Sequence, residues 1–142
     1  MSIGVQTQLY TGMQETYTRL ITEGENALYA GLTGDSRQQV APSTTEGEGV
    51  VDRQLANPLY LVGIIGGLLN TRLPGEGSAC ITMQYEFLAP VHCGDRIDMV
   101  IELTGLDVGK HLATFRTNCY NQDKHQVIAG QAVMLVPGHM LP

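Results

Sequence analysis

Residues 57–77, NPLYLVGIIGGLLNTRLPGEG, form the longest apolar run of the chain and have a clear start and stop. Asn57 can cap a helix, and Pro58 suits the first helical position, where no amide hydrogen is needed. The run therefore predicts a helix that extends to Leu69 or Leu73 and ends before the Pro-Gly turn that follows. Because almost none of its side chains are polar, we expect this helix to be buried against a sheet that wraps around it.

The composition is typical of one compact domain spanning residues 1–142. The chain is 43% hydrophobic and 15% charged, which suits a single folded unit with a real core. A net charge of −6 with only 8 Lys and Arg argues against a nucleic-acid or anionic-membrane partner. The N-terminus lacks a signal-peptide pattern, and about a dozen apolar residues are too few to cross a bilayer. We expect no membrane partner and a cytoplasmic location.

The cysteines do not indicate a metal or a disulfide. Cys80, Cys93 and Cys119 lie in or beside apolar strand-like patterns. They are odd in number and have neither CxxC nor zinc-site spacing. We interpret them as reduced, buried thiols, and in the absence of any nucleotide motif we predict no metal and no cofactor.

The first part of the chain carries weaker patterns. Thr22 and Glu25 have the spacing of a capping box and are followed by apolar residues at near-helical spacing. They predict a short helix that ends at Gly34. Residues 1–20 are compatible with one or two short strands, on the alternation around Val5, Leu9, Tyr17 and Leu20.

Residues 35–56 show little periodicity and are rich in Gln, Ser, Thr, Gly and Glu. This composition predicts a long surface loop, with a helical turn near residues 50–55. Loops of this length in a compact domain are usually functional or mobile.

After residue 78 the apolar period changes to two, which is typical of half-buried strands. The predicted strands are 80–87, 97–104, 111–120 and 126–136, with turns at 90–95, 107–110 and 121–125. Their order favours an antiparallel meander. The fold class is therefore α+β, with an antiparallel sheet wrapped around a central buried helix.

Two segments carry a resemblance to a known family. Residues 73–78 read LPGEGS and residues 87–95 read FLAPVHCGD. These resemble the Leu-Pro-Gly turn and the Phe-x-x-Pro-Val-x-x-Gly-Asp segment of the hotdog-fold, MaoC-like (R)-specific enoyl-CoA hydratases. The resemblance covers roughly residues 12–137. It implies a single hotdog domain, a homodimer with sheets joined edge to edge, and a bound acyl thioester of CoA or a carrier protein.

The catalytic motif of that family is only partly present. In the family, Gly-Asp-x-Asn-Pro-x-His supplies an Asp and a His that hold a water and exchange protons. Residues 34–40 read GDSRQQV, so Asp35 matches the aspartate and Val40 stands at the histidine position. A gap in the alignment with the family motif cannot place a histidine here, because residues 35–91 contain none.

The helix entrance differs from the family as well. Asn57 and Pro58 stand where the family has His-Gly, and a proline has no N–H, so an oxyanion contact from that amide is lost. Gly63 stands where some hydratases carry a serine, and small residues here leave room for an acyl chain. The candidate substrate-binding residues are Arg37, Val40, Asn57, Leu59, Tyr60 and Gly63.

Several roles remain open for individual residues. Asp35, the candidate catalytic residue, could be a carboxylate whose pKa is raised in an apolar tunnel, or a cap that accepts backbone N–H bonds. Arg37 fits either a substrate phosphate or carboxylate, or an exposed charge. Tyr60 could offer its hydroxyl or simply pack. We interpret four histidines as surface residues: His92, His111, His125 and His139.

Three functions follow from these observations. The first is conjugate addition to a 2-enoyl thioester, in which Asp35 manages protons and the nucleophile is water or another group such as an amine. The second is an acyl thioesterase, and the third is a non-catalytic acyl-thioester-binding subunit, in line with the loss of the family's His, His-Gly and Ser. We favour the first because a retained Asp35 is easier to explain if protons are transferred. Hydration at full rate is not expected, since Val40 cannot exchange a proton.

Overall fold

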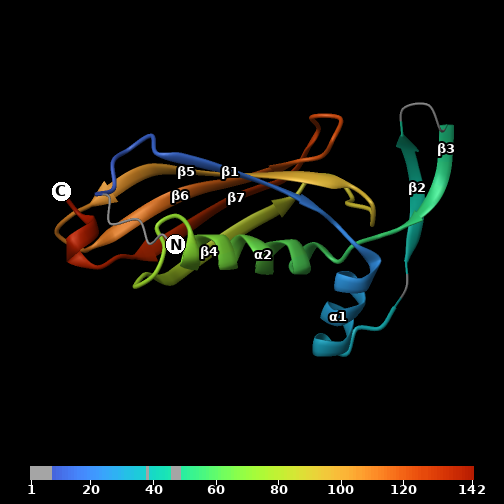
Figure 1. The fold of residues 1–142 in the computed structure, drawn as a ribbon, viewed down its shortest axis with the longest axis horizontal. Helices are drawn as coiled ribbons and strands as arrows, with labels where there is room; N and C mark the ends of the chain where they lie inside the picture. The colour runs from blue at the N-terminus through green and yellow to red at the C-terminus, as the bar shows by residue number, and fades with distance from the viewer. Residues whose placement is uncertain (1–7, 38, 46–48) are drawn as a thin grey trace.

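The computed structural model describes residues 8–37, 39–45 and 49–142. Its main body is a five-stranded antiparallel sheet with one long helix lying against it (Figure 1), as predicted for the α+β class. The predicted N-terminal strand near Tyr17 is confirmed, whereas Val5 lies outside the described residues. The strands of the sheet are β1 (Gln14–Leu20), β4 (Ala79–Phe87), β5 (Arg96–Asp107), β6 (Leu112–Tyr120) and β7 (Gln126–Leu135).

Helix α2 (Pro58–Thr71) forms where the apolar run predicts it. The Leu59 N–H donates to Asn57 Oδ1 at 2.9 Å, so Asn57 is the predicted N-cap. In the part of the chain that the structure describes, no helix is long and apolar enough to span a membrane. The side chains that α2 buries are Tyr60, Leu61, Ile65, Leu68 and Leu69.

The opposite face of α2 is exposed, which differs from the predicted fully buried helix. Leu59 is 53% exposed, and Gly63, Gly67 and Asn70 are also exposed. These residues recur at three- or four-residue intervals, so they share one side of the helix. The sheet of this chain therefore covers α2 on one side only.

The core lies between α2 and one face of the sheet. Along β5 and β6, alternate side chains are fully buried, which is the period of two that the sequence shows. Apolar side chains on these strands thus fill the space under the helix. The largest of them are Ile97, Met99, Leu103 and Phe115.

Strand β4 does not pair with β5, so the predicted four-stranded meander is wrong at this point. The order of the sheet is β1-β5-β6-β7-β4, and only β5, β6 and β7 follow one another as neighbours. Phe87 of β4 pairs with Ile128 of β7. Residues 88–95 therefore cross from one edge of the sheet towards the other and do not form a hairpin turn.

The predicted loop at residues 35–56, with its helical turn near residues 50–55, is also wrong, because most of this segment forms strands. β2 (Val40–Thr45) and β3 (Gly49–Gln54) pair as an antiparallel hairpin that extends away from the main sheet in Figure 1. The β-branched pair Val50 and Val51 favours a strand. The Gly, Glu and Gln residues around this pair are typical of loops, so the sequence did not predict a strand here.

The predicted short helix is confirmed as α1 (Glu23–Thr33). The Glu25 N–H donates to Thr22 Oγ1 at 3.1 Å, and Gly34 ends the helix with a positive φ of 81°. No residue of α1 is buried. Its contacts with the rest of the fold combine Tyr29, which is partly buried and packs against the core, with hydrogen bonds from neighbouring elements to Glu25 and Asn26.

One packing contact gives a stability prediction. A Cβ at Gly130 would lie 2.3 Å from ring carbons of Tyr85 and 2.6 Å from Thr117 Oγ1. We expect Gly130→Ala to lower the free energy of unfolding by about 1–3 kcal/mol, as overpacking does, measured by urea denaturation. Gly105→Ala is the matched control in β5, because a Cβ there meets nothing within 4 Å. Equal losses in both variants would contradict the prediction.

Candidate active site

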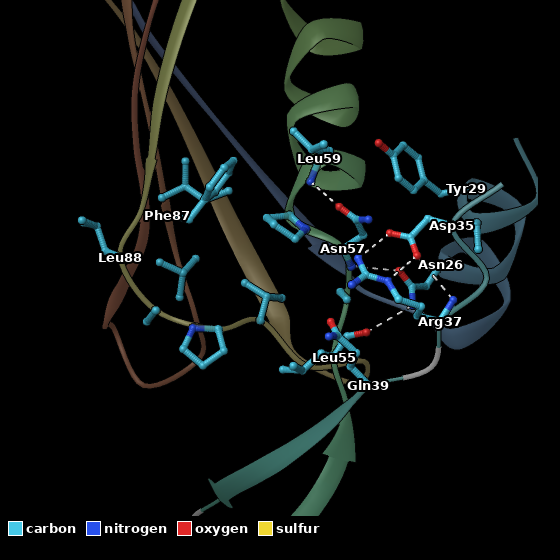
Figure 2. A pocket seen from close by; sticks show the side chains of 18 residues that line it. Asn26, Tyr29, Asp35, Arg37, Gln39, Leu55, Asn57, Leu59, Phe87 and Leu88 are labelled. Carbon is cyan, nitrogen blue, oxygen red and sulfur yellow. Dashed lines mark hydrogen bonds and ion pairs between the residues drawn. The ribbon is translucent and has the colours of Figure 1, made fainter. Parts of the chain in front are cut away.

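A cleft of about 630 Å³ opens between the N-terminal end of α2, the segment after α1 and the segment after β4. Figure 2 shows that its two sides differ in chemistry. The polar side consists of Asn26, Tyr29, Asp35, Arg37, Gln39 and Asn57. Such a cleft, with an apolar wall and a few converging polar groups, is the usual form of a small-molecule site.

The apolar side of the cleft comes from the end of β4, the crossing segment that follows it and the start of β7. Phe87 lies across the cleft from the polar residues (Figure 2), and the next residue, Leu88, also lines the cleft. The remaining residues on this side are Ala89, Pro90, Val91, Val127 and Ile128. This wall suits a hydrocarbon chain, because burying apolar surface on both partners is favourable.

Asp35 lies at the polar side, directly after α1. The positive φ of Gly34 turns the chain there, and the Asp35 N–H donates to Thr33 Oγ1 at 3.3 Å. At the other end of this segment the Leu55 N–H donates to the Gln39 carbonyl at 2.7 Å. The segment that carries Asp35 is thus fixed at both ends.

The Asp35 carboxylate forms a bidentate ion pair with Arg37. Arg37 Nε donates to Oδ1 at 2.7 Å, and Nη2 donates to Oδ2 at 2.9 Å. These hydrogen bonds hold the pKa of Asp35 below its ordinary value of 3.8, at about 2. Of the two roles left open for Asp35, the raised pKa is not found, because Arg37 lies two residues away. Asp35 Oδ1 instead accepts the Arg37 backbone N–H at 3.4 Å, as the second role requires. The carboxylate is ionised at neutral pH.

The backbone amides at the entrance of α2 are all engaged. The Asn57 N–H donates to Asn26 Oδ1 at 3.0 Å, and the Leu59 N–H donates to Asn57 Oδ1 at 2.9 Å. The Tyr60 N–H donates to the Asn57 carbonyl at 3.0 Å. Pro58 has no N–H. The entrance therefore offers no free backbone donor from these four residues.

Tyr60 does not line the cleft. Its side chain is buried, and its hydroxyl donates to Glu25 Oε1 at 2.9 Å. Arg19 pairs with the same carboxylate, and the Tyr29 ring lies 6.2 Å from the Tyr60 ring. Burial raises the pKa of Tyr60. Of its two possible roles, Tyr60 therefore has the packing role. Through Glu25 and Tyr29 it also connects α2 to α1.

Four of the seven predicted site residues meet in the cleft: Asp35, Arg37, Asn57 and Leu59. Val40 and Gly63 do not line it, because Val40 begins β2 and Gly63 lies on the exposed face of α2.

The sequence analysis missed several residues that line the cleft. Asn26, Tyr29 and Gln39 carry no motif that would single them out, whereas residues 87–91 belong to the segment that carries the family resemblance. That segment could have been assigned to the site on this ground.

His92 and Cys80 differ from their predicted environments. His92 is only 6% exposed, with its Nδ1 3.7 Å from Asp95 Oδ2, whereas the other three histidines are exposed as predicted. Cys80 is exposed, and Cys93 and Cys119 are buried thiols as predicted. Among the described residues, no group of three His, Cys, Asp or Glu side chains could hold a metal ion.

A sheet wrapped around one helix, with a cleft at the helix entrance, defines the hotdog fold, and solved structures agree. The (R)-hydratase from A. caviae involved in PHA biosynthesis has a TM-score of 0.76 and 26% identity over 91% of this chain and 98% of that chain. The R-hydratase PhaJ1 from Pseudomonas aeruginosa has a TM-score of 0.77 and 25% identity, covering 91% and 83%.

Sequence relatives define the family. A scan against protein-family models gives no match. The (R)-specific enoyl-CoA hydratase of Rhodospirillum rubrum is 32% identical over 126 residues, which are 89% of this chain and 87% of the relative. The 3-hydroxybutyryl-CoA dehydratase of Methylorubrum extorquens is 29% identical over 129 residues, covering 91% and 82%. The chain belongs to the MaoC-like (R)-specific enoyl-CoA hydratase family.

The ion pair gives a pH prediction. We expect Arg37→Gln to raise the pKa of Asp35 from about 2 towards 3.8, because the charged hydrogen bonds are lost. A lowered carboxylate pKa contributes stability that is present above the unfolded-state pKa and is lost as the pH falls through the folded-state pKa. The parent should therefore be more stable than the variant above about pH 4, and this difference should disappear as the pH falls towards 2.

The pKa of Asp35 can be measured by NMR titration of its ¹³C carboxyl resonance. Arg116→Gln is the control, because Arg116 pairs with Glu102 at 3.1 Å, not with Asp35. An Asp35 pKa that stays near 2 in Arg37→Gln would show that the ion pair is not its cause.

Proposed function

We propose that this protein catalyses addition of a nucleophile to, or elimination from, a 2-enoyl acyl thioester, with Asp35 as the group that exchanges protons. Family membership and the names of the hydratase and dehydratase relatives support this reaction class. The observation that carries the proposal is the position of Asp35, which lies at the polar side of a cleft whose other side is apolar. A thioester held along the apolar side would present its reacting carbons to the carboxylate.

The charge state of Asp35 fits the first step of hydration. Its lowered pKa keeps the carboxylate ionised near neutral pH, so it can accept a proton from an attacking water. The same low pKa makes it a weak base, and Arg37 occupies both of its oxygens. Val40 cannot share the task. The proposed rate is therefore well below that of a site with both an Asp and a His.

The proposal also names candidates for the nucleophile that is added and for the carrier of the acyl thioester. Water is the first candidate, as in the named hydratase relatives, and a small amine is the second, since the site lacks the histidine that holds water in the family. CoA is the first carrier to test, because the relatives are named for CoA esters. An acyl carrier protein is the alternative.

The working unit that we propose is a homodimer. Among residues 8–37, 39–45 and 49–142, β4 pairs along one edge, with β7, and no strand pairs with its other edge, which therefore offers backbone groups to a partner strand. Ile81 on β4 is 53% exposed, and α2 shows its exposed face of Leu59, Gly63 and Gly67. A second copy that pairs through β4 would cover these apolar groups. The buried free thiols Cys93 and Cys119 suit a reducing compartment, so we retain the cytoplasm as the proposed location.

The test of the function uses mass spectrometry with 2-enoyl-CoA esters of several chain lengths, with and without glycine. We expect a hydrated or amine adduct from the parent protein and about 10²–10⁴-fold less from Asp35→Asn, because a positioned proton-transfer group contributes that much. Asp123→Asn, in the turn between β6 and β7, is the control and should retain activity.

Other outcomes would replace the proposal. Release of free acid and free CoA would indicate a thioesterase. An unchanged substrate that still binds would indicate a non-catalytic acyl-thioester-binding subunit. Equal activity in Asp35→Asn and the parent would remove Asp35 from the mechanism.

The dimer is tested separately by light scattering after size-exclusion chromatography. We expect the parent to have twice the chain mass of 15.4 kDa and Ile81→Lys to shift to the monomer mass, because a buried lysine charge would be costly at the interface. Val108→Lys is the control, since Val108 is 46% exposed in the turn between β5 and β6. A parent protein that is monomeric would refute the assembly.

A further inference from the structure

Addition to a 2-enoyl thioester places negative charge on the carbonyl oxygen. When the oxygen of water bonds to the β-carbon, the C=C electron pair shifts and the carbonyl becomes an enolate. The proton that water loses is then returned to the α-carbon, so that one H and one OH are added in total. A preorganised donor at the carbonyl oxygen typically raises kcat by about 10²–10³. The cleft must therefore contain a donor that can reach this oxygen.

The backbone N–H groups of residues 57–60 cannot supply that hydrogen-bond donor. Asn26 Oδ1 accepts the Asn57 N–H, and Asn57 accepts the N–H groups of Leu59 and Tyr60. A backbone N–H at position 58 is ruled out by proline. A donor in this part of the cleft must therefore come from a side chain.

The side-chain amide of Asn57 has the required properties. Its Oδ1 accepts the Leu59 N–H at 2.9 Å, which fixes the orientation of the group and leaves the NH₂ as the other end. Within residues 8–37, 39–45 and 49–142, no acceptor bonds to Asn57 Nδ2. Figure 2 shows this amide between Leu59 and the Asp35–Arg37 ion pair, inside the cleft.

Arg37 is a poorer candidate for the same role. Its Nε and Nη2 donate to Asp35, and its side chain is 72% exposed. A donor that is already engaged and open to water is less effective than one that is fixed by the protein and faces the cleft.

We propose that Asn57 Nδ2 donates the hydrogen bond that polarises the thioester carbonyl, in place of the backbone amide that Pro58 lacks. The inference rests on the proposed function and names a second residue of the same site. Asp35 then handles the proton of the nucleophile, and Asn57 stabilises the enolate oxygen. The residue that caps α2 through its oxygen thus acts on the substrate through its nitrogen.

The decisive variant is Asn57→Asp. Aspartate keeps an oxygen that can accept the Leu59 N–H and cap the helix, but it replaces the NH₂ donor by a second oxygen. We expect kcat for crotonyl-CoA hydration to fall about 10²–10³-fold, with a melting temperature close to that of the parent. If this variant unfolds, Asn57→Ser also caps helices, lacks the NH₂ and should show the same loss of kcat.

Asn121→Asp is the matched control for this substitution. Asn121 Oδ1 accepts the N–H groups of Asp123 and His125 at 3.0 and 3.1 Å in the turn between β6 and β7, away from the cleft. The same chemical change therefore occurs at another capping asparagine. We expect its kcat to remain that of the parent.

A second measurement separates this inference from the proposed reaction. The infrared C=O stretch of bound, ¹³C-labelled butanoyl-CoA should shift to lower wavenumber on the parent protein and not on Asn57→Asp. An active parent whose kcat and carbonyl shift are unchanged in Asn57→Asp would overturn the role of Asn57 and leave the reaction intact. A parent without enoyl-CoA turnover, whose carbonyl shift still depends on Asn57, would overturn the reaction and retain the donor.

Discussion

The arrangement of the site depends on the hydrogen-bonded junction between Asn26, Asn57 and Leu59. Asn26 Oδ1 accepts the Asn57 N–H, and Asn57 Oδ1 accepts the Leu59 N–H. The junction ties α1 to the first turn of α2. No residue of α1 is fully buried, and Tyr29 packs against the core from its partly buried position, so these bonds add to an apolar contact between the two helices. The segment with Asp35, which follows α1, takes its position from the same junction.

The site combines a retained carboxylate with altered neighbours. Asp35 stands where the family resemblance puts an aspartate, and Arg37 donates to both of its oxygens. Val40, at the histidine position of the resemblance, is the first residue of β2. A fold can keep its shape while the chemistry of its site changes, because function depends on the few side chains that converge there. Under the proposed function, such a change lies at positions 37 and 40.

The helix that forms the core also connects the site to the proposed assembly. One face of α2 packs on the sheet, and the other exposes Leu59, which also lines the cleft. A second copy that covered the exposed face would therefore border the substrate. The unpaired edge of β4 and the apolar wall at Phe87 belong to one continuous strand. Assembly and substrate binding would thus share elements.

The sequence alone determined helices α1 and α2, the residues that cap their N-termini and the five strands of the main sheet, because caps, turns and apolar periods are local properties. It also determined that Asp35 is present and that residues 35–91 contain no histidine. Only the tertiary structure decided that β4 pairs with β7, that His92 is buried and that Arg37 lowers the pKa of Asp35. The first two features depend on which distant segments pack together, and the third depends on the side-chain rotamers of Asp35 and Arg37. A local sequence pattern specifies neither the packing of distant segments nor a rotamer.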